Sequence, residues 1–550
     1  MRTRLMYGFA VLFFASACSD NSGAGDGGGD ASPTPVDGGG QDVGQDVAID
    51  TGGQDVAVDT GGQDVAVDTA PPCVTTKLPT EDACVVTDAE GIFVSASMGS
   101  LAGDGTMAKP MVSLQAGITA AKSANKRVYA CAETYAEAIT LQDGVSVFGY
   151  FDCANAWAVG TAHAKVQATT SPAAIATSVT STTRVESVDF VAPDFTTGSQ
   201  SSIALLASGS PGLQFVNDKF HAGTGGKGAD GASGIQLVDS GTAKNGANAW
   251  NDGVCLGTIC PITNYMQPGG GTNVCTGETG HDGGPGGPGG YPGEFQSKFV
   301  TNSYAWVAVD QGTTAGFPTI TTSQTAQGGA LGMAGSPGAA GAAGSGNGSP
   351  GANLGVISAS GYAPSDGASG GDGAPGQGGG GSGGYYYSLP SDYTAGSYAG
   401  KYGWAEPGPG GGAGGCPGLA GQVGKGGGAS IAIVAISSAF TLTGAVVESS
   451  AGGAAGAAGG SSTPTAGGNG GAPSKDTVTG GKGGAGGAAG VSGNGGGGPS
   501  IGLAYQGTSP TQSTTTITQG QGGAGVAQRV VNGQTIPASP SGLSQSTYSF

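Results

Sequence analysis

The sequence predicts an all-β protein, a parallel β-solenoid with long glycine-rich inserts behind a disordered N-terminal tether. Three observations support this prediction: a repeated pair of strand patterns, glycine at every third position in several tracts, and an unusual composition. Of the 550 residues 117 are Gly, 37% are apolar and only 10% are charged. An average chain has about 7% Gly and about 25% charged residues, so only part of this chain can bury an ordinary core.

Three segments share one pattern, which consists of an alternating apolar strand, a polar break, a second alternating strand and a glycine-rich tract. They begin at Ser202, Ser430 and Ser500. Such a strand pair is typical of one coil of a solenoid, which buries its apolar face only by stacking on neighbouring coils. Residues 180–191 are a candidate for another coil. Residues 431–447 could pass for a membrane helix, but their Ser, Thr and β-branched content favours buried strands.

The segment after Cys73 contains further strand patterns and one helix pattern. Leu114, Ile118 and Ala121 recur at helical spacing after Pro110 and predict a helix. Glu133–Thr134 is expected to be a turn. The β-branched and aromatic runs predict strands at 92–94, 128–131, 138–141 and 145–151.

Residues 91–153 resemble the opening of bacterial right-handed parallel β-helices. They are similar to a small domain of unknown function that often begins pectin-lyase-like chains. The resemblance implies a right-handed parallel β-helix and says almost nothing about chemistry. The matching marks are the Phe93-Val94-Ser95 strand, Gly105–Thr106 with Lys109–Pro110, the Leu114–Gln115 helix, and the Tyr129 strand followed by Thr134–Tyr135.

The glycine-rich tracts keep a strict period of three. This period matches an extended left-handed helix with about three residues per turn, and glycine at each third position leaves one face free of side chains. A second such helix can then approach within backbone hydrogen-bonding distance. The periodic runs are Gly277–Gly289, Gly329–Gly344, Gly367–Gly379 and Gly481–Gly493.

We interpret these tracts as a bundle of polyglycine-II-like helices folded back within one chain. A collagen-like triple helix would need three chains, and its X and Y positions would contain more proline. A disordered linker is the other alternative, because glycine loses the most backbone entropy on ordering. The tracts follow the second strand of each repeat, so we expect them to leave the solenoid on one side and to pack together.

The N-terminus has the features of a secretory signal. Arg2 and Arg4 precede an apolar stretch and small residues, and Cys18 follows at the expected cleavage point. This arrangement resembles a bacterial lipobox, which implies a signal peptide at 1–17 and a diacylglycerol on the Cys18 thiol. The apolar stretch is shorter than the roughly 20 residues of a membrane span. The alternative is an ordinary signal peptide with an incidental cysteine.

Residues 18–72 are expected to form a solvated tether. Residues 19–72 contain eleven Asp and no Lys, Arg or Glu, and a nine-residue unit at 52–60 recurs at 61–69. So few large apolar groups cannot offset the entropy of ordering the chain. Calcium binding by the Asp repeats is the alternative, but they lack the close carboxylate spacing and the closing Glu of a calcium loop.

The cysteines predict a disulfide framework. Of nine cysteines, lipidation of Cys18 would leave an even number, which suits an exported chain. Cys131 and Cys153 end two strands 22 residues apart, about one coil, so they could face each other and bond, or remain buried thiols. The disulfide candidates are Cys73, Cys84, Cys131, Cys153, Cys255, Cys260, Cys275 and Cys416.

Zinc is the competing interpretation for part of this set. Cys255, Cys260 and Cys275 lie near His281 in the sequence, but the spacing is loose and an oxidising compartment disfavours thiolate ligands. The segment 225–233 contains a single calcium-repeat-like match that ends near Asp230, without the tandem copies that such a site needs. We therefore expect no metal ion and no cofactor.

The search for catalytic motifs gives no candidate catalytic residue. The serious enzyme alternative is a polysaccharide lyase or hydrolase, or a polysaccharide-binding protein, by analogy with pectin-lyase-like β-helices. Its sites need clustered acids and bases, and the nearest approach is Arg184 with Asp189 and Asp218 with Lys219. These residues are too few to name a site, and fold alone does not establish function.

The sequence therefore predicts a structural or adhesive protein without catalytic activity, anchored by lipid at the bacterial outer membrane or cell surface. Expected partners are the membrane, surface glycans or other cell-surface proteins. Nucleic acid is excluded as a partner because the net charge is −19 and no Lys/Arg-rich patch exists. The predicted domains are 1–17 signal peptide, 18–72 tether, 73–222 N-terminal part of the β-helix, 223–428 glycine-rich inserts with intervening strands, and 429–550 C-terminal coils with glycine-rich inserts.

Overall fold

The computed structural model describes residues 73–249, 268–290, 294–300, 303–310, 333–384, 402–404, 407–473 and 478–550. The chain groups into two units, Met1–Pro71 and Pro72–Phe550, and all of the described residues belong to the second unit. They are almost entirely β structure and extended glycine-rich chain, as predicted.

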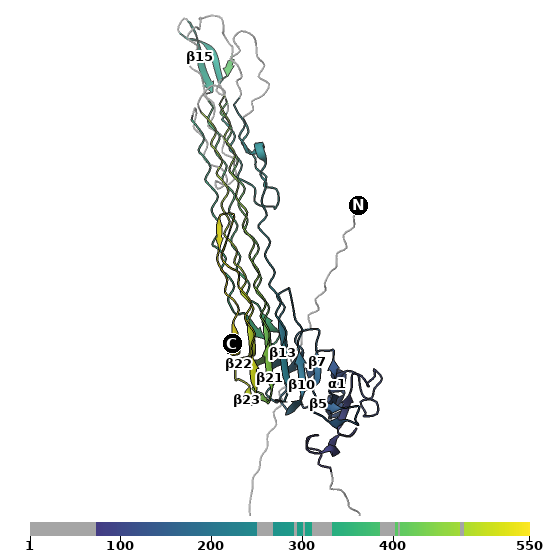
Figure 1. Ribbon diagram of the computed structural model, residues 1–550. Coiled ribbons are helices and arrows are strands. Elements are labelled where there is room, and N and C mark those ends of the chain that lie inside the picture. Colours follow the sequence, from purple (N-terminus) through teal and green to yellow (C-terminus); the bar gives the residue numbers. More distant parts are fainter. Residues whose placement is uncertain are drawn as a thin grey trace, which may run out of the picture. The chain divides into compact units, whose positions relative to one another are not determined.

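Three parallel sheets form the body of this unit (Figure 1). The first contains, in spatial order, β1 (Gly91–Val94), β2 (Arg127–Cys131), β5 (Val147–Asp152), β9 (Thr183–Glu186), β12 (Leu213–Val216), β20 (Thr441–Thr443) and β23 (Thr511–Ser513), with the short antiparallel β6 (Ala158–Val159) beside β5. The second contains β3 (Thr134–Tyr135), β7 (Ala164–Gln167), β10 (Val188–Val191), β13 (Lys219–Ala222), β21 (Val446–Ser449) and β24 (Thr516–Thr518). The third contains β4 (Ile139–Leu141), β8 (Ala174–Thr177), β11 (Ser202–Ser208), β19 (Ser430–Ile436), β22 (Ser500–Gln506) and β27 (Ser544–Ser549).

From β11 onward the chain visits the third, first and second sheets in a fixed order, an arrangement compatible with a β-helix. Ser202 pairs with Ser430 and Ser430 with Ser500, so the three sequence repeats stack in register, as predicted. The predicted coil at 180–191 contributes β9 and β10, which precede β11. Residues 431–447 lie in β19, β20 and β21, and no helix among the described residues is long and apolar enough to cross a membrane.

The second strand of each repeat was predicted as one strand, and this prediction is wrong. It bends into two strands on different sheets, because one residue at each corner has a left-handed backbone. These residues are Asn217 (φ 55°), Gly444 (φ 64°) and Thr514 (φ 49°). The Asn217 N–H donates to Thr443 O at 2.9 Å, so the corners of adjacent coils are bonded to one another. Asn and Gly adopt this conformation at low cost.

The apolar core lies between the three sheets and is closed at its N-terminal end by α1 (Leu114–Ala124). Leu114, Ile118 and Ala121 of this helix are fully buried in the core, as their spacing predicted. Ser113 caps the helix by accepting the Ala116 N–H at 3.1 Å. The predicted turn at Glu133–Thr134 is partly wrong, since Thr134 begins β3, which pairs with β7.

All glycine-rich inserts leave the body at one corner, as predicted. They run from the second sheet to the third, between β13 and β19, between β21 and β22, and between β24 and β27. The tracts run side by side (Figure 1) and are bonded at intervals of three residues. Gly225, Gly228, Gly231 and Gly234 donate to Ala451, Ala454, Ala457 and Gly460 at 2.7–2.9 Å. The described tracts are therefore joined by regular backbone hydrogen bonds, which argues against the alternative of a disordered linker.

One periodic run departs from the expected pattern. Gly277 (φ 128°) and Gly280 (φ 87°) lie in a turn, and the chain 268–290 folds back on itself, with Gly286 N donating to Gly271 O at 2.9 Å. Positive φ angles at these glycines reverse the chain direction, which strict periodicity alone did not indicate. Gly329 and Gly332 lie outside the described residues.

Several short elements interrupt the inserts; intervening strands were predicted within 223–428 without bounds, whereas the hairpin of β25 and β26 was not predicted. Ile357 of one hairpin packs against Ile203 and Leu206 and covers the outward face of the third sheet. The elements within the inserts are η2 (Gly241–Lys244), the antiparallel strands β14 (Glu294–Val300), β15 (Ser303–Asp310) and β18 (Tyr402–Trp404), and the hairpins β16–β17 (Val356–Ser358, Gly361–Ala363) and β25–β26 (Arg529–Val531, Gln534–Ile536). A further short helix, η1 (Ala83–Val85), precedes β1 in the body.

Candidate functional site

Two regions stand out as candidates for function: the interior of the glycine bundle and the outward face of the second sheet. In the bundle, Gly411 shows why glycine is needed. Its N–H donates to Gly287 O and its carbonyl accepts from Gly271 N, both at 2.8 Å, while a Cβ would overlap the Gly379 carbonyl. Three stretches of chain therefore meet at one residue with no space for a side chain.

Polar side chains complete the hydrogen bonding at the margins of the bundle. Asp230, Asp366 and Asp372 each accept one backbone N–H of a neighbouring tract, at 2.7–2.8 Å. The hydrogen bond from Ala457 N–H lowers the pKa of Asp230, so Asp230 serves as a backbone acceptor here. Sequence reasoning missed this role; the available signal was an Asp or Asn next to a periodic glycine. Asn245 and Asn248 act in the same way.

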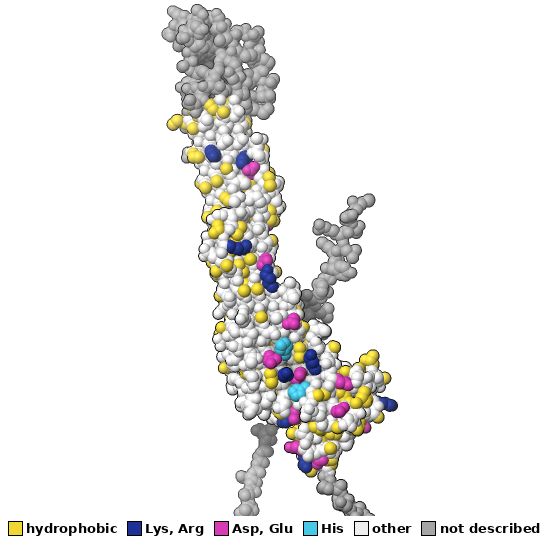
Figure 2. Space-filling model, viewed as in Figure 1, with side chains coloured by type: hydrophobic (Ala, Val, Ile, Leu, Met, Phe, Trp, Pro, Cys, Tyr) yellow, Lys and Arg dark blue, Asp and Glu magenta, His cyan; other side chains and the backbone are white. Residues whose placement is uncertain are grey.

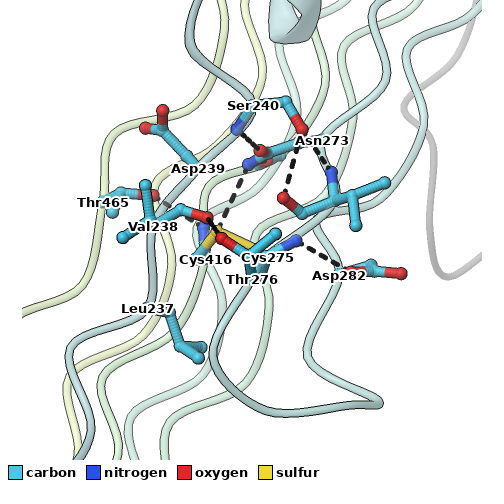
Figure 3. Close-up of a disulfide and its surroundings, with 12 residues drawn as sticks. Leu237, Val238, Asp239, Ser240, Asn273, Cys275, Thr276, Asp282, Cys416 and Thr465 are labelled. Atoms are coloured by element: carbon cyan, nitrogen blue, oxygen red, sulfur yellow. Dashed lines mark hydrogen bonds between the residues drawn. A yellow bond between two sulfur atoms is a disulfide. The ribbon is translucent and has the colours of Figure 1, made fainter.

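A disulfide joins two parts of the bundle (Figure 3). Cys275 and Cys416 have Cα atoms 5.8 Å apart and are 141 residues apart in sequence. Cys275 N–H donates to Asp282 and Cys416 N–H to Thr465, both at 2.8 Å. Buried Asn273 donates from Nδ2 to Gly414 O at 2.7 Å. The disulfide therefore links the hairpin 268–290 to the tract 407–428 at a buried position, where the backbone N–H groups of both cysteines have hydrogen-bond acceptors.

Two further disulfides lie in the N-terminal part of the body. Cys73 bonds to Cys84, and Cys131 bonds to Cys153, the pair that the strand spacing suggested. Cys18, Cys255 and Cys260 lie outside the described residues. Because Cys275 is paired with Cys416, it is not free to act as a zinc ligand. The residues that the structure describes contain no cluster of three metal-ligating side chains.

The outward face of the second sheet carries a charged ladder. Lys165, Asp189 and Lys219 occupy adjacent register positions on β7, β10 and β13. His163 Nδ1 lies 2.7 Å from the Asp189 carboxylate, and His221 pairs with Glu448 at 3.5 Å on the next row. Figure 2 shows histidine, lysine and acidic side chains close together over the sheets and few charges along the tracts. The charged ladder therefore places lysine and aspartate side chains close enough together to contact a single ligand.

The other two residues considered for an enzyme site do not join this ladder. Arg184 lies on the first sheet and its Nε donates to Glu186 at 2.8 Å. Asp218 is buried in the corner between β12 and β13, where its two oxygens accept the N–H groups of Val188 and Val216 at 2.7 and 2.9 Å. Only Asp189 and Lys219, of the four, share one accessible face.

We expect Asp218→Ala to destabilise the body, because it leaves the buried N–H of Val188 and the half-buried N–H of Val216 without this acceptor, and an unpaired buried N–H costs about 1–3 kcal/mol. Burial raises the pKa of Asp218 well above its usual value. A carboxyl whose pKa is raised on folding stabilises most below the unfolded pKa, and this contribution is lost as the pH rises through the folded pKa. The penalty, from denaturant unfolding, should therefore be larger at pH 5 than at pH 8. Asp194→Ala, which removes an exposed acceptor of Thr224 N–H, is the control; an equal loss from both variants would contradict the expectation.

Comparison of the chain with protein-family models, with curated proteins and with solved structures gives no match. The functional proposal therefore rests on the fold, the glycine bundle and the charged ladder.

Proposed function

We propose that this chain is an exported, lipid-anchored cell-surface protein with a structural or adhesive role and no catalytic activity. Its tether would hold a right-handed parallel β-helix of the pectin-lyase-like type, decorated by a polyglycine-II-like bundle, at the outer membrane or cell surface. Surface glycans or other surface proteins would be its partners. The single observation that carries this proposal is the bundle, with its backbone hydrogen bonds at three-residue intervals.

The chemistry of the bundle supports a structural role. Much of its interior is glycine backbone, and residues such as Gly411 have no space for a side chain. Three disulfides join described cysteines, as expected for a chain that leaves the reducing cytosol. The acidic residues at its margin accept backbone N–H groups, as Asp366 does from Gly426, and so support the packing of tracts.

The anchor is tested by mass spectrometry of the mature N-terminus. We expect a lipid-modified Cys18 as the first residue, and Cys18→Ser should release the protein from the membrane fraction. An unmodified Cys18 would remove the anchor from the proposal. The adhesive role is tested separately: cells that display the full chain should bind to surfaces or to a glycan array better than cells without it, and no difference would leave only a structural role.

A polysaccharide-binding or polysaccharide-cleaving function is the second candidate. It is favoured by the ladder of Lys165, Asp189 and Lys219 with His163, because lysines suit uronate carboxylates and a carboxylate–histidine pair suits proton transfer. The full chain is incubated with pectin or alginate, with and without calcium. Release of unsaturated oligosaccharide that is lost in Lys219→Ala would replace the non-catalytic proposal. Retention of the polysaccharide without cleavage would instead support binding.

A further inference from the structure

An asparagine followed by glycine is prone to deamidation, because glycine has no side chain to hinder its nitrogen from reaching the asparagine side chain. The nitrogen attacks the side-chain carbonyl carbon, ammonia leaves, and a succinimide ring remains. Water then opens this ring at either carbonyl and gives aspartate or isoaspartate. The sequence contains five such pairs, and the structure describes all of them: Asn245–Gly246, Asn347–Gly348, Asn469–Gly470, Asn494–Gly495 and Asn532–Gly533.

Hydrogen bonds between tracts hold both reacting groups at the first two pairs. At Asn245 the side-chain Oδ1 accepts the Asn469 N–H at 2.8 Å, and the N–H of the next glycine donates to the Asn469 carbonyl at 2.9 Å. At Asn347 both groups bond in the same way to Val491, at 3.1 and 2.7 Å. Attack at these pairs therefore requires two hydrogen bonds to open first.

Two more pairs are held by the tracts 455–462. Asn494 is fully buried, its Oδ1 accepts the Ala458 N–H at 2.8 Å, and the N–H of the next glycine donates to Gly456 O at 3.0 Å. Asn532 lies in the turn of the β25–β26 hairpin, where its Nδ2 donates to Ser461 O at 2.8 Å. Asn494 is thus held as firmly as the first two pairs, and Asn532 by one bond of its side chain.

Asn469 differs from the other four asparagines. Its side chain is exposed, and among the described residues neither its side-chain amide nor the Gly470 N–H has a hydrogen-bond partner. Only its main chain is held, by the two bonds to Asn245 and the glycine after it. The Gly470 nitrogen can therefore approach the Asn469 side chain without breaking a hydrogen bond of either reacting group.

We propose that Asn469–Gly470 is a site of spontaneous deamidation in the folded protein, and that the glycine bundle protects the other pairs. The isoaspartate product adds one carbon to the main chain between Gly468 and Gly471. The N–H groups of these glycines donate to Ala413 O and Gly410 O, both at 2.7 Å, three residues apart on each tract. Isoaspartate should disturb this matched spacing, whereas aspartate keeps it.

The proposal is tested by ageing the full chain, folded in mild detergent, at mildly alkaline pH in heavy-oxygen water. Peptide mass spectrometry then counts only the acid formed during ageing, because that acid carries oxygen from the solvent. We expect Asn469 to convert at least about tenfold faster than Asn245, Asn347 or Asn494, whose reacting groups are each held by two hydrogen bonds. In denaturant all of the pairs should convert at similar rates, since glycine follows each asparagine.

Asn469→Gln is the matched control for the consequence, because its longer side chain closes a ring slowly. Ageing should speed hydrogen exchange of 407–413 in the unmodified chain and not in this variant. Asn469→Asp, which carries the aspartate product from the start, should exchange like the fresh unmodified chain. Similar rates at all pairs in the folded protein, or faster conversion at any other pair, would overturn the proposal. Equal acceleration of exchange in aged Asn469→Gln would overturn the structural consequence. None of these outcomes depends on the anchor at Cys18.

Discussion

Gly411→Val should unfold the glycine bundle locally while leaving the stacked coils intact. The new side chain would overlap the Gly379 carbonyl, and relief of that overlap would separate tracts joined through the Gly411 N–H and C=O bonds. Overpacking costs about 1–3 kcal/mol and each lost hydrogen bond about 1 kcal/mol, so a loss of about 3–5 kcal/mol is expected. The rate of backbone hydrogen exchange in peptides from 268–290, 365–384 and 407–428 measures this loss of local stability.

The matched control for this substitution is Gly269→Ala. Gly269 is exposed and a Cβ there meets no atom within 4 Å, so exchange should remain as in the unmodified protein. Peptides from β11 and β19 should stay protected in both variants. If Gly411→Val exchanged no faster than Gly269→Ala, tight packing of glycine faces would not be what holds the tracts together.

Removal of the bundle disulfide by Cys275→Ser with Cys416→Ser is expected to be the second large effect. The bond closes a loop of 141 residues, and a loop of that length corresponds to about 4–5 kcal/mol in the chain-entropy account. Because both sulfurs are buried in the bundle beside Leu237 and Leu419, the loss should appear there. The midpoint of denaturant unfolding and the rate of proteolysis within 268–290 report it.

Cys73→Ser with Cys84→Ser provides a comparison, because that bond spans only 11 residues and lies outside the glycine-rich tracts. It should leave proteolysis of 268–290 unchanged. A bundle that resists protease equally in both double variants would show that its backbone hydrogen bonds suffice without the covalent link.

Much of the fold follows from the sequence because the repeats combine period-two strands with period-three glycine. The register of Ser202, Ser430 and Ser500 could be predicted since a shift of one residue would turn the apolar face outward. The corner at Asn217 was missed, although the buried positions change phase there, from Leu213 and Phe215 before it to Phe220 and Ala222 after it. Strands were expected within 223–428, but their bounds could not be predicted because glycine-rich flanks hide short strands.

The candidate site was less accessible from sequence. Asp189 and Lys219 meet through sheet register, which brings together residues 30 positions apart. Asp218 looked like a surface charge beside Lys219, yet the corner turns it inward between two backbone N–H groups. Asp366 and Asp372 accept backbone N–H groups from the tracts that lie next to them. Because every tract has glycine at the same period of three, the sequence does not indicate which tracts are neighbours.

The common exit corner also constrains the order in which the protein can be assembled. The coil that contains β13 is continued by β19 only after residues 223–429 have been made, and Gly415 of that insert donates to Gly484, which is synthesised later still. The entropic cost of closing a loop rises only slowly with its length. The long insert between β13 and β19 therefore costs the folded protein little stability. A nascent chain that has not yet reached residue 484 therefore leaves the Gly415 N–H without this acceptor, and unpaired edges of this kind are prone to aggregation.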